Sequence, residues 1–130
     1  ARLGGDLSVA GGRLAAVRRL AADLDSVVLL KGAVTVIAGA NGSAVVSASG
    51  PPDLATAGSG DVLSGLIGSL VAANHVADST DLARVAGAGA YLHGVAARLA
   101  AAGGRPIVSE DVLTAVPDAV ALARNVAAGG

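Results

Sequence analysis

The sequence of 130 residues contains no cysteine, methionine, phenylalanine or tryptophan, and one tyrosine. The absence of cysteine excludes a disulfide framework and a thiolate metal site, and it fits a reducing compartment. We therefore expect a cytoplasmic protein. Because large aromatic side chains are missing, the core must consist mainly of leucine, valine and alanine. Such side chains bury little area per residue, at about 25 cal/mol per Å².

Runs of one residue class are also missing. Nine basic and ten acidic residues give a formal net charge of −1, and no Lys/Arg-rich run indicates a nucleic-acid partner. Hydrophobic residues make up 53% of the chain, but no apolar run reaches the roughly 20 residues that a membrane span needs. Ala1 opens the chain without a charged-then-apolar signal segment. We expect a portion of a longer protein, with neither nucleic acid nor membrane as partner.

The first half of the chain predicts one helix followed by three strands. Apolar residues recur at helical spacing over residues 12–24. The apolar run at residues 27–30 is typical of a strand buried on both faces of a parallel sheet. Residues 34–38 and 44–47 predict two more strands, and Asn41-Gly42 between them is a hairpin signal.

The second half predicts three helices, over residues 61–74, 82–99 and from Ser109 to about residue 126. Ser109 is the expected N-cap of the last helix, and Pro117 is expected to kink or restart it. The order of one helix, three strands and three helices indicates a layered α/β architecture. Small residues in the middle helix predict close packing, and its glycines are Gly87, Gly89 and Gly94.

Residues 55–61, Ala-Thr-Ala-Gly-Ser-Gly-Asp, are the most informative segment. Glycines let backbone amides crowd together, and a helix N-terminus adds unpaired donors with a partial positive charge, so the segment predicts an anion site. Asp61 could be a simple capping residue there. The flexible residues before it favour a second role, in which Asp61 accepts a proton from a substrate hydroxyl while the amides of residues 58–61 hold a phosphate.

Other polar positions leave alternatives open. Lys31 follows a predicted strand, and a solvated surface lysine is favoured over a nucleotide contact. Thr56 and Ser59 could bind phosphate or stabilise the turn. His93 is expected to be a satisfied packing histidine. No set of His, Cys and acidic residues predicts a metal site, and the glycines match neither the P-loop nor the dinucleotide-binding pattern.

Three segments together resemble a known family. Lys31-Gly32-Ala33 after a strand, the motif at residues 55–65 and Tyr91-Leu92-His93-Gly94 resemble the ribokinase-like superfamily, and within it the ADP/ATP-dependent NAD(P)H-hydrate dehydratases. Pro51-Pro52-Asp53 stands where the family usually has Asn-Pro-Gly, and Ala57 replaces a glycine. The resemblance implies a layered sheet with helices on both faces. It also implies that residues 1–130 are the carboxy-terminal portion of a longer domain.

The resemblance implies a metabolite-repair lyase that restores NADH and NADPH from their hydrates. Phosphate from ADP or ATP, with Mg²⁺, would pass to the substrate hydroxyl and then be eliminated. Asp61 matches the catalytic aspartate. The matching nucleotide-binding residues are Lys31, Gly32, Ala33, Val34, Thr35, Gly58, Ser59 and Gly60.

The same pattern of residues is compatible with two other functions. A ribokinase-like kinase of a vitamin precursor would use Asp61 in the same way. A fragment that binds adenine nucleotide without catalysis would need only the loop. An exposed sheet edge predicts a homo-oligomer or association with the remainder of the domain.

Overall fold

The computed structural model describes residues 12–129. Its elements follow the expected order, with one short 3₁₀ helix added before the second α-helix. They are α1 (Gly12–Asp23), β1 (Val28–Leu30), β2 (Thr35–Ala38), β3 (Ala44–Ser47), η1 (Pro52–Leu54), α2 (Ser59–Ala73), α3 (Ser79–Ala100) and α4 (Ser109–Ala128).

The three strands form an antiparallel sheet in the order β1-β2-β3. Leu29 pairs with Ile37, which in turn pairs with Val45. The expectation of a parallel sheet with a first strand buried on both faces is therefore wrong, since the residues of β1 are only half-buried. The connections explain the outcome, because a parallel pair needs a crossover of a dozen or more residues and these strands are joined by short turns. The Asn41-Gly42 hairpin is confirmed, with Gly42 at φ 84°.

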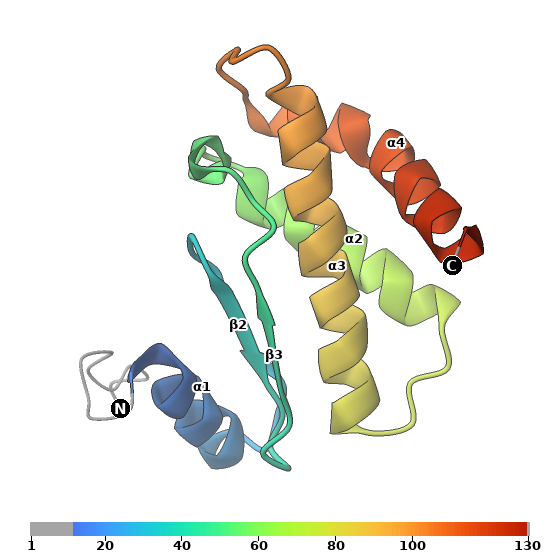
Figure 1. Ribbon diagram of the computed structural model, residues 1–130. Helices are drawn as coiled ribbons and strands as arrows, with labels where there is room; N and C mark the ends of the chain where they lie inside the picture. The colour runs from blue at the N-terminus through green and yellow to red at the C-terminus, as the bar shows by residue number, and fades with distance from the viewer. Residues whose placement is uncertain (1–11, 130) are drawn as a thin grey trace.

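Helices cover both faces of this sheet, as expected. The strands lie between α1 on one side and α3 on the other (Figure 1). Side chains alternate along a strand, so Val36 and Ala38 face Val17 and Ala21 of α1. Ile37 points the other way and packs among residues of α2 and α3.

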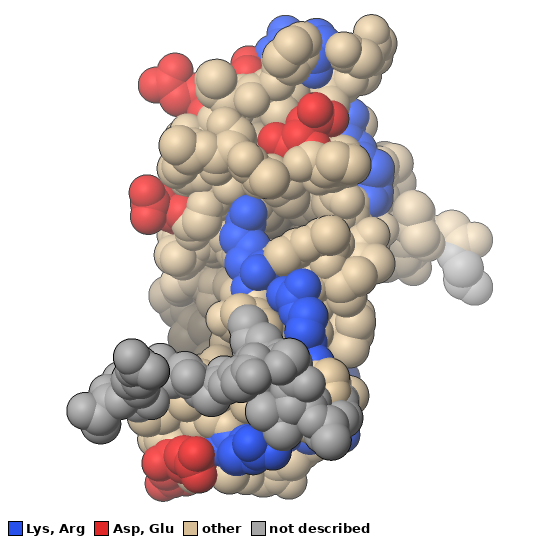
Figure 2. Space-filling model, turned by 90° about the vertical axis from the view of Figure 1, so that its left-hand side faces the viewer, with Lys and Arg blue, Asp and Glu red and all other residues tan. Residues whose placement is uncertain are grey.

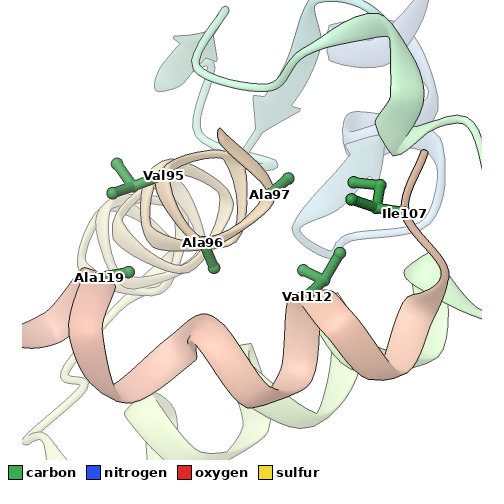
Figure 3. Close-up of a cluster of buried hydrophobic side chains, with 6 residues drawn as sticks. All are labelled: Val95, Ala96, Ala97, Ile107, Val112 and Ala119. Carbon is green, nitrogen blue, oxygen red and sulfur yellow. The ribbon is translucent and has the colours of Figure 1, made fainter. Parts of the chain in front are cut away.

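A second hydrophobic core lies between α3 and α4, next to the loop that connects them. Figure 3 shows its six buried side chains, which come from the two helices and the segment between them. Valine, alanine and isoleucine fill this cluster, as the missing aromatics require. They are Val95, Ala96, Ala97, Ile107, Val112 and Ala119.

The glycines of α3 confirm the expected close packing. An added Cβ at Gly87 would lie 2.7 Å from Val45 Cγ1, and one at Gly89 would lie 2.6 Å from Ile67 Cγ1. At Gly94 the obstacle is backbone, since the added atom would lie 2.7 Å from the nitrogen of Gly50. Backbone cannot rotate away, so Gly94 fixes α3 against the chain that follows β3.

The start and course of α4 differ from expectation. Its N-cap is Val108 rather than Ser109, and the Asp111 carboxylate accepts from the Val108 amide at 2.9 Å. Pro117 lies inside one helix that runs from Ser109 to Ala128, without a restart. Pro117 is exposed, and water can satisfy the carbonyl that loses its donor there.

In the part of the chain that the structure describes, no helix combines the length and apolar character that a membrane span requires.

Candidate functional site

The chain turns sharply just before α2. Gly58 is the N-cap and adopts φ 79°, ψ −12°, a left-handed conformation that glycine adopts without strain. The amide of Ser59 donates to the Thr56 carbonyl at 3.3 Å, and that of Asp61 donates to the Gly58 carbonyl at 3.0 Å. Within residues 12–129, the amides of Gly58 and Gly60 have no acceptor. The prediction that all four amides of residues 58–61 are available is therefore wrong for Ser59 and Asp61.

The turn is open to a ligand at Gly60. No atom lies within 4 Å of a Cβ built at this residue, so the backbone is accessible at close range. Two free amides beside the positive end of the α2 dipole give the turn the chemistry of an anion site.

A backbone carbonyl ties this turn to the end of β1. The backbone carbonyl of Leu54, in η1, accepts hydrogen bonds from the Ser59 hydroxyl at 2.9 Å and from Lys31 Nζ at 3.2 Å. Ser59 is 1% exposed, so its hydroxyl stabilises the turn rather than contacting a ligand directly. Lys31 is half-buried, and the interpretation of Lys31 as a freely solvated surface lysine is wrong.

Lys31 borders a hollow of about 400 Å³ at the sheet end nearest α2. Thr35 is 8% exposed and lines a much smaller cavity beneath it. Val34 lines neither space and is 39% exposed. The residues around the hollow are Lys31, Gly32, Ala33, Gly50, Pro51, Pro52, Leu54 and Ala55.

Arg13 of α1 also belongs to this region. Its guanidinium donates to the Lys31 carbonyl at 3.5 Å. A Cβ added at Gly32 would lie 2.5 Å from Arg13 Nη2, so this glycine makes room for the arginine. Basic side chains lie side by side on the face that carries the β1–β2 turn (Figure 2). Two cations beside a hollow favour a ligand with negative charge.

Asp61 lies in the first turn of α2, exposed to solvent. It borders a different hollow, of about 500 Å³, between α2 and α4. This hollow shares no lining residue with the one beside Lys31, so the structure does not bring Asp61 and Lys31 into one pocket. The turn at residues 56–60 connects the two along the chain.

His93 is buried beneath the turn. It is 2% exposed, and within the described residues its Nε2 has no hydrogen-bond partner. Burial lowers the pKa of His93 below its usual value of 6.5, the charge of Lys31 lowers it further, and a backbone hydrogen bond with Ser59 opposes both. The prediction of a satisfied packing histidine is therefore only half right. Spacing along a helix could not reveal an unpaired nitrogen.

No group of three or more His or acidic side chains that could hold a metal occurs in residues 12–129. The segment at residues 55–65 contains Asp61 as its carboxylate. A magnesium ion would therefore fit here as part of a metal–nucleotide complex, with phosphate oxygens as most of its ligands.

Comparison with known proteins gives a consistent result. The family model for NAD(P)H-hydrate dehydratase matches residues 1–117. The ADP-dependent (S)-NAD(P)H-hydrate dehydratase of Neisseria meningitidis is 47% identical over 85 residues, which are 65% of this chain and 27% of that protein. The bifunctional NAD(P)H-hydrate repair enzyme Nnr of Moorella thermoacetica is 40% identical over 107 residues, 81% of this chain and 19% of the relative.

Solved structures share the fold. YxkO of Bacillus subtilis, a member of the UPF0031 family, superposes with a TM-score of 0.71 at 28% identity over 82% of this chain and 39% of its own. The ADP/ATP-dependent NAD(P)H-hydrate dehydratase from Bacillus subtilis, co-crystallised with ATP/Mg²⁺, gives 0.65 at 28% identity, covering 82% of this chain and 38% of its own. The chain thus spans less than a third of the two curated relatives. It belongs to the NAD(P)H-hydrate dehydratase family.

Proposed function

We propose that this chain takes part in the nucleotide-dependent dehydration of hydrated NADH and NADPH, as the carboxy-terminal portion of the catalytic domain. One observation carries the proposal: the turn with free amides at Gly58 and Gly60 is followed at once by the exposed carboxylate of Asp61. Relatives are named for this reaction, and one was co-crystallised with ATP/Mg²⁺. Because the sequence has no cysteine, we also propose a cytoplasmic location.

The nucleotide-binding role falls to the segments that meet at the Leu54 carbonyl. Lys31 and Arg13 provide positive charge beside the hollow, and Gly32 and Ala33 form part of its wall. The amides of Gly58 and Gly60 would hold phosphate oxygens. The buried Ser59 and Thr35 would support the nucleotide-binding segments from the protein interior. Val34 belongs to the same segment as Lys31, Gly32 and Ala33, just before β2.

Asp61 is the proposed base. Its carboxylate would accept the proton of the substrate hydroxyl as that oxygen attacks the terminal phosphorus of ADP or ATP, while the bridging P–O bond breaks and AMP or ADP leaves. The C–O bond of the new phosphate ester would then break, so that inorganic phosphate leaves with the former hydroxyl oxygen, and loss of a proton from the neighbouring carbon restores the double bond. A bound nucleotide with Mg²⁺ supplies the phosphoryl group and neutralises its charge.

The position of Asp61 agrees with this division of roles. It is exposed and lines the hollow between α2 and α4, which is separate from the hollow beside Lys31. A nucleotide held beside Lys31 with its phosphates over Gly58 and Gly60 would bring its terminal phosphate toward Asp61. The hydrated ring would then approach from the side of α2 and α4.

The test is an absorbance assay with hydrated NADH, ADP or ATP, and Mg²⁺, which follows the regained absorbance of NADH. We expect Asp61→Asn to lower the rate by about 10²–10⁴-fold, because it removes the base but keeps the size of the side chain. Asp53→Asn is the matched control, since it removes an exposed carboxylate of η1 and should retain the rate.

Two outcomes would contradict the proposal. Nucleotide consumption only in the presence of a vitamin alcohol would indicate a kinase. Nucleotide binding without turnover of either substrate would indicate a binding fragment.

A further inference from the structure

The side chain of Arg13 reaches from α1 to the turn between β1 and β2. Arg13 is the second residue of the helix, and its Nη2 donates to the Lys31 carbonyl at 3.5 Å. Lys31 and the following residue, Gly32, both line the hollow of about 400 Å³. The guanidinium therefore lies against the wall of the proposed nucleotide site. We propose that Arg13 binds a phosphate of the nucleotide, as a second cation beside Lys31.

Gly32 leaves the space that this guanidinium fills. A Cβ built at Gly32 would lie 2.5 Å from Nη2 and 2.8 Å from Nη1 of Arg13. Both terminal nitrogens of the arginine thus lie over one side of the turn. Gly32 does not have a positive φ, so its backbone conformation is open to other residues. The missing side chain at this position therefore makes room for the arginine and is not required by the turn itself.

The guanidinium has donors available for a ligand. A guanidinium carries several N–H donors in a planar fork, and the fork matches two oxygens of one phosphate. Within residues 12–129, the contact with the Lys31 carbonyl is the one hydrogen bond of the Arg13 side chain, and this side chain forms no ion pair there. An N–H···O bond is usually about 2.7–3.2 Å long, so this contact of 3.5 Å is weak and a phosphate can replace it.

The charge of the hollow explains why a second cation is needed. Lys31 Nζ donates to the Leu54 carbonyl, which also accepts from the Ser59 hydroxyl, so the ammonium group lies beside the turn before α2. Arg13 contacts the other end of the same lysine, at its backbone carbonyl. The remaining residues that line the hollow have no charged side chain. Because the phosphates of ADP or ATP carry several negative charges, one lysine does not balance them, and Arg13 adds the second positive charge.

The inference rests on the proposed function, and calorimetric titration with ADP at about 50 and about 500 mM NaCl separates the two. Arg13→Gln removes the charge and keeps a polar side chain, whereas Arg13→Lys keeps the charge. Gly32→Ala retains the arginine but displaces its guanidinium through the added Cβ. Arg18→Gln is the matched control, because Arg18 is another exposed arginine of α1 that donates to a turn carbonyl. Its acceptor is Gly42, at 3.2 Å, in the turn at the other end of β2.

We expect Arg13→Gln and Gly32→Ala each to weaken ADP binding about tenfold at the lower salt concentration, the loss of a hydrogen bond to a charged group. The double variant should bind no more weakly than Arg13→Gln alone, because both changes remove the same contact. Arg13→Lys should stay within about threefold of the original affinity, and Arg18→Gln should leave it unchanged. The higher salt concentration should reduce the difference between Arg13→Gln and the original protein.

If the unchanged protein binds no ADP, the proposed nucleotide site fails and this inference with it. If it binds ADP and Arg13→Gln binds equally well, or loses affinity by the same factor at both salt concentrations, the inference alone is overturned. Additive losses in the double variant would also overturn it, because they would show that Gly32 acts without the arginine. If Arg13→Gln does not fold, Gly32→Ala displaces the same guanidinium, and an unchanged affinity in that variant overturns the inference.

Discussion

Single backbone groups organise the site at the scale of residues. The Leu54 carbonyl accepts from Lys31 and Ser59, which are 28 positions apart in the sequence. One acceptor thus fixes both proposed nucleotide-binding segments. Gly58 makes this arrangement possible, because its left-handed backbone turns the chain into α2.

Gly58→Ala should therefore destabilise the protein. The left-handed conformation costs an alanine about 1–2 kcal/mol, and the new Cβ would lie 2.8 Å from the Ser109 hydroxyl. Urea denaturation measures the effect. Gly60→Ala is the control, because that position is helical and open and alanine should not lower stability there. Equal loss of stability in both variants would contradict the conformational explanation.

His93 predicts a dependence of stability on pH. Its pKa is lowered in the folded protein, by burial first and then by Lys31. As pH falls below 6.5, the unfolded chain takes up a proton that the folded chain does not. Stability then decreases by up to about 1.4 kcal/mol per pH unit until the lowered pKa is reached, and the contribution vanishes at higher pH.

His93→Gln removes this titration. Unfolding free energies at about pH 7.5 and about pH 5.5 should differ less in the variant than in the original protein. The same loss between the two pH values in both proteins would show that other groups cause the acid sensitivity.

At the scale of elements, α4 shows how a helix is started without the expected cap. The Asp111 carboxylate accepts from the Val108 amide and forms an ion pair with Arg105. The Arg105 side chain of this ion pair is 57% exposed, and the pair contributes about 0–1 kcal/mol. The bond to the Val108 amide is the larger contribution, because it satisfies a donor at the helix N-terminus.

Asp111→Ala should lower the free energy of unfolding by about 0.5–2 kcal/mol. Arg105→Ala removes the ion pair alone and should cost less than about 1 kcal/mol. Urea denaturation of both variants separates the two effects. A larger loss from the arginine substitution would contradict the assignment.

Local signals predicted the elements better than their arrangement. Helical and strand periodicity placed most elements within a few residues, because apolar spacing follows from burial of one face. The antiparallel sheet was missed because a short buried apolar run occurs in both kinds of sheet. Ser109 is a good cap by residue type, but the Asp111 carboxylate reaches the Val108 amide instead. Which of the two neighbouring residues, Val108 or Ser109, begins the helix depends on atomic positions that residue type does not define.

The candidate site was predicted only in part, because only some of its residues are neighbours in the sequence. Glycines and an acid in one segment pointed to the turn and to Asp61, since those neighbours are adjacent in the chain. Arg13 and His93 were not recognised as site residues, because each reaches the site from a helix distant in sequence. Contacts formed by tertiary packing leave no local pattern.

At the scale of the whole molecule, the sheet is covered unevenly. Helix α1 packs against β1 and β2, and β3 is an edge of the described sheet. Val46 of β3 is on the face that α1 occupies, yet it is 57% exposed. An apolar residue on an unpaired edge strand favours pairing with another chain.

We therefore expect concentration-dependent self-association that Val46→Lys weakens about tenfold. Burial of a valine contributes roughly 1.5 kcal/mol, and a lysine on the edge also opposes pairing through repulsion between copies. Sedimentation equilibrium over a range of concentrations measures the constant, with Ala72→Lys on the exposed part of α2 as a charge-matched control. A protein that stays monomeric throughout, or a Val46→Lys variant that associates as strongly as the control, would show that this edge is not the contact. Loss of association in the Val46 variant alone would place the contact at β3, away from the turn that carries Asp61.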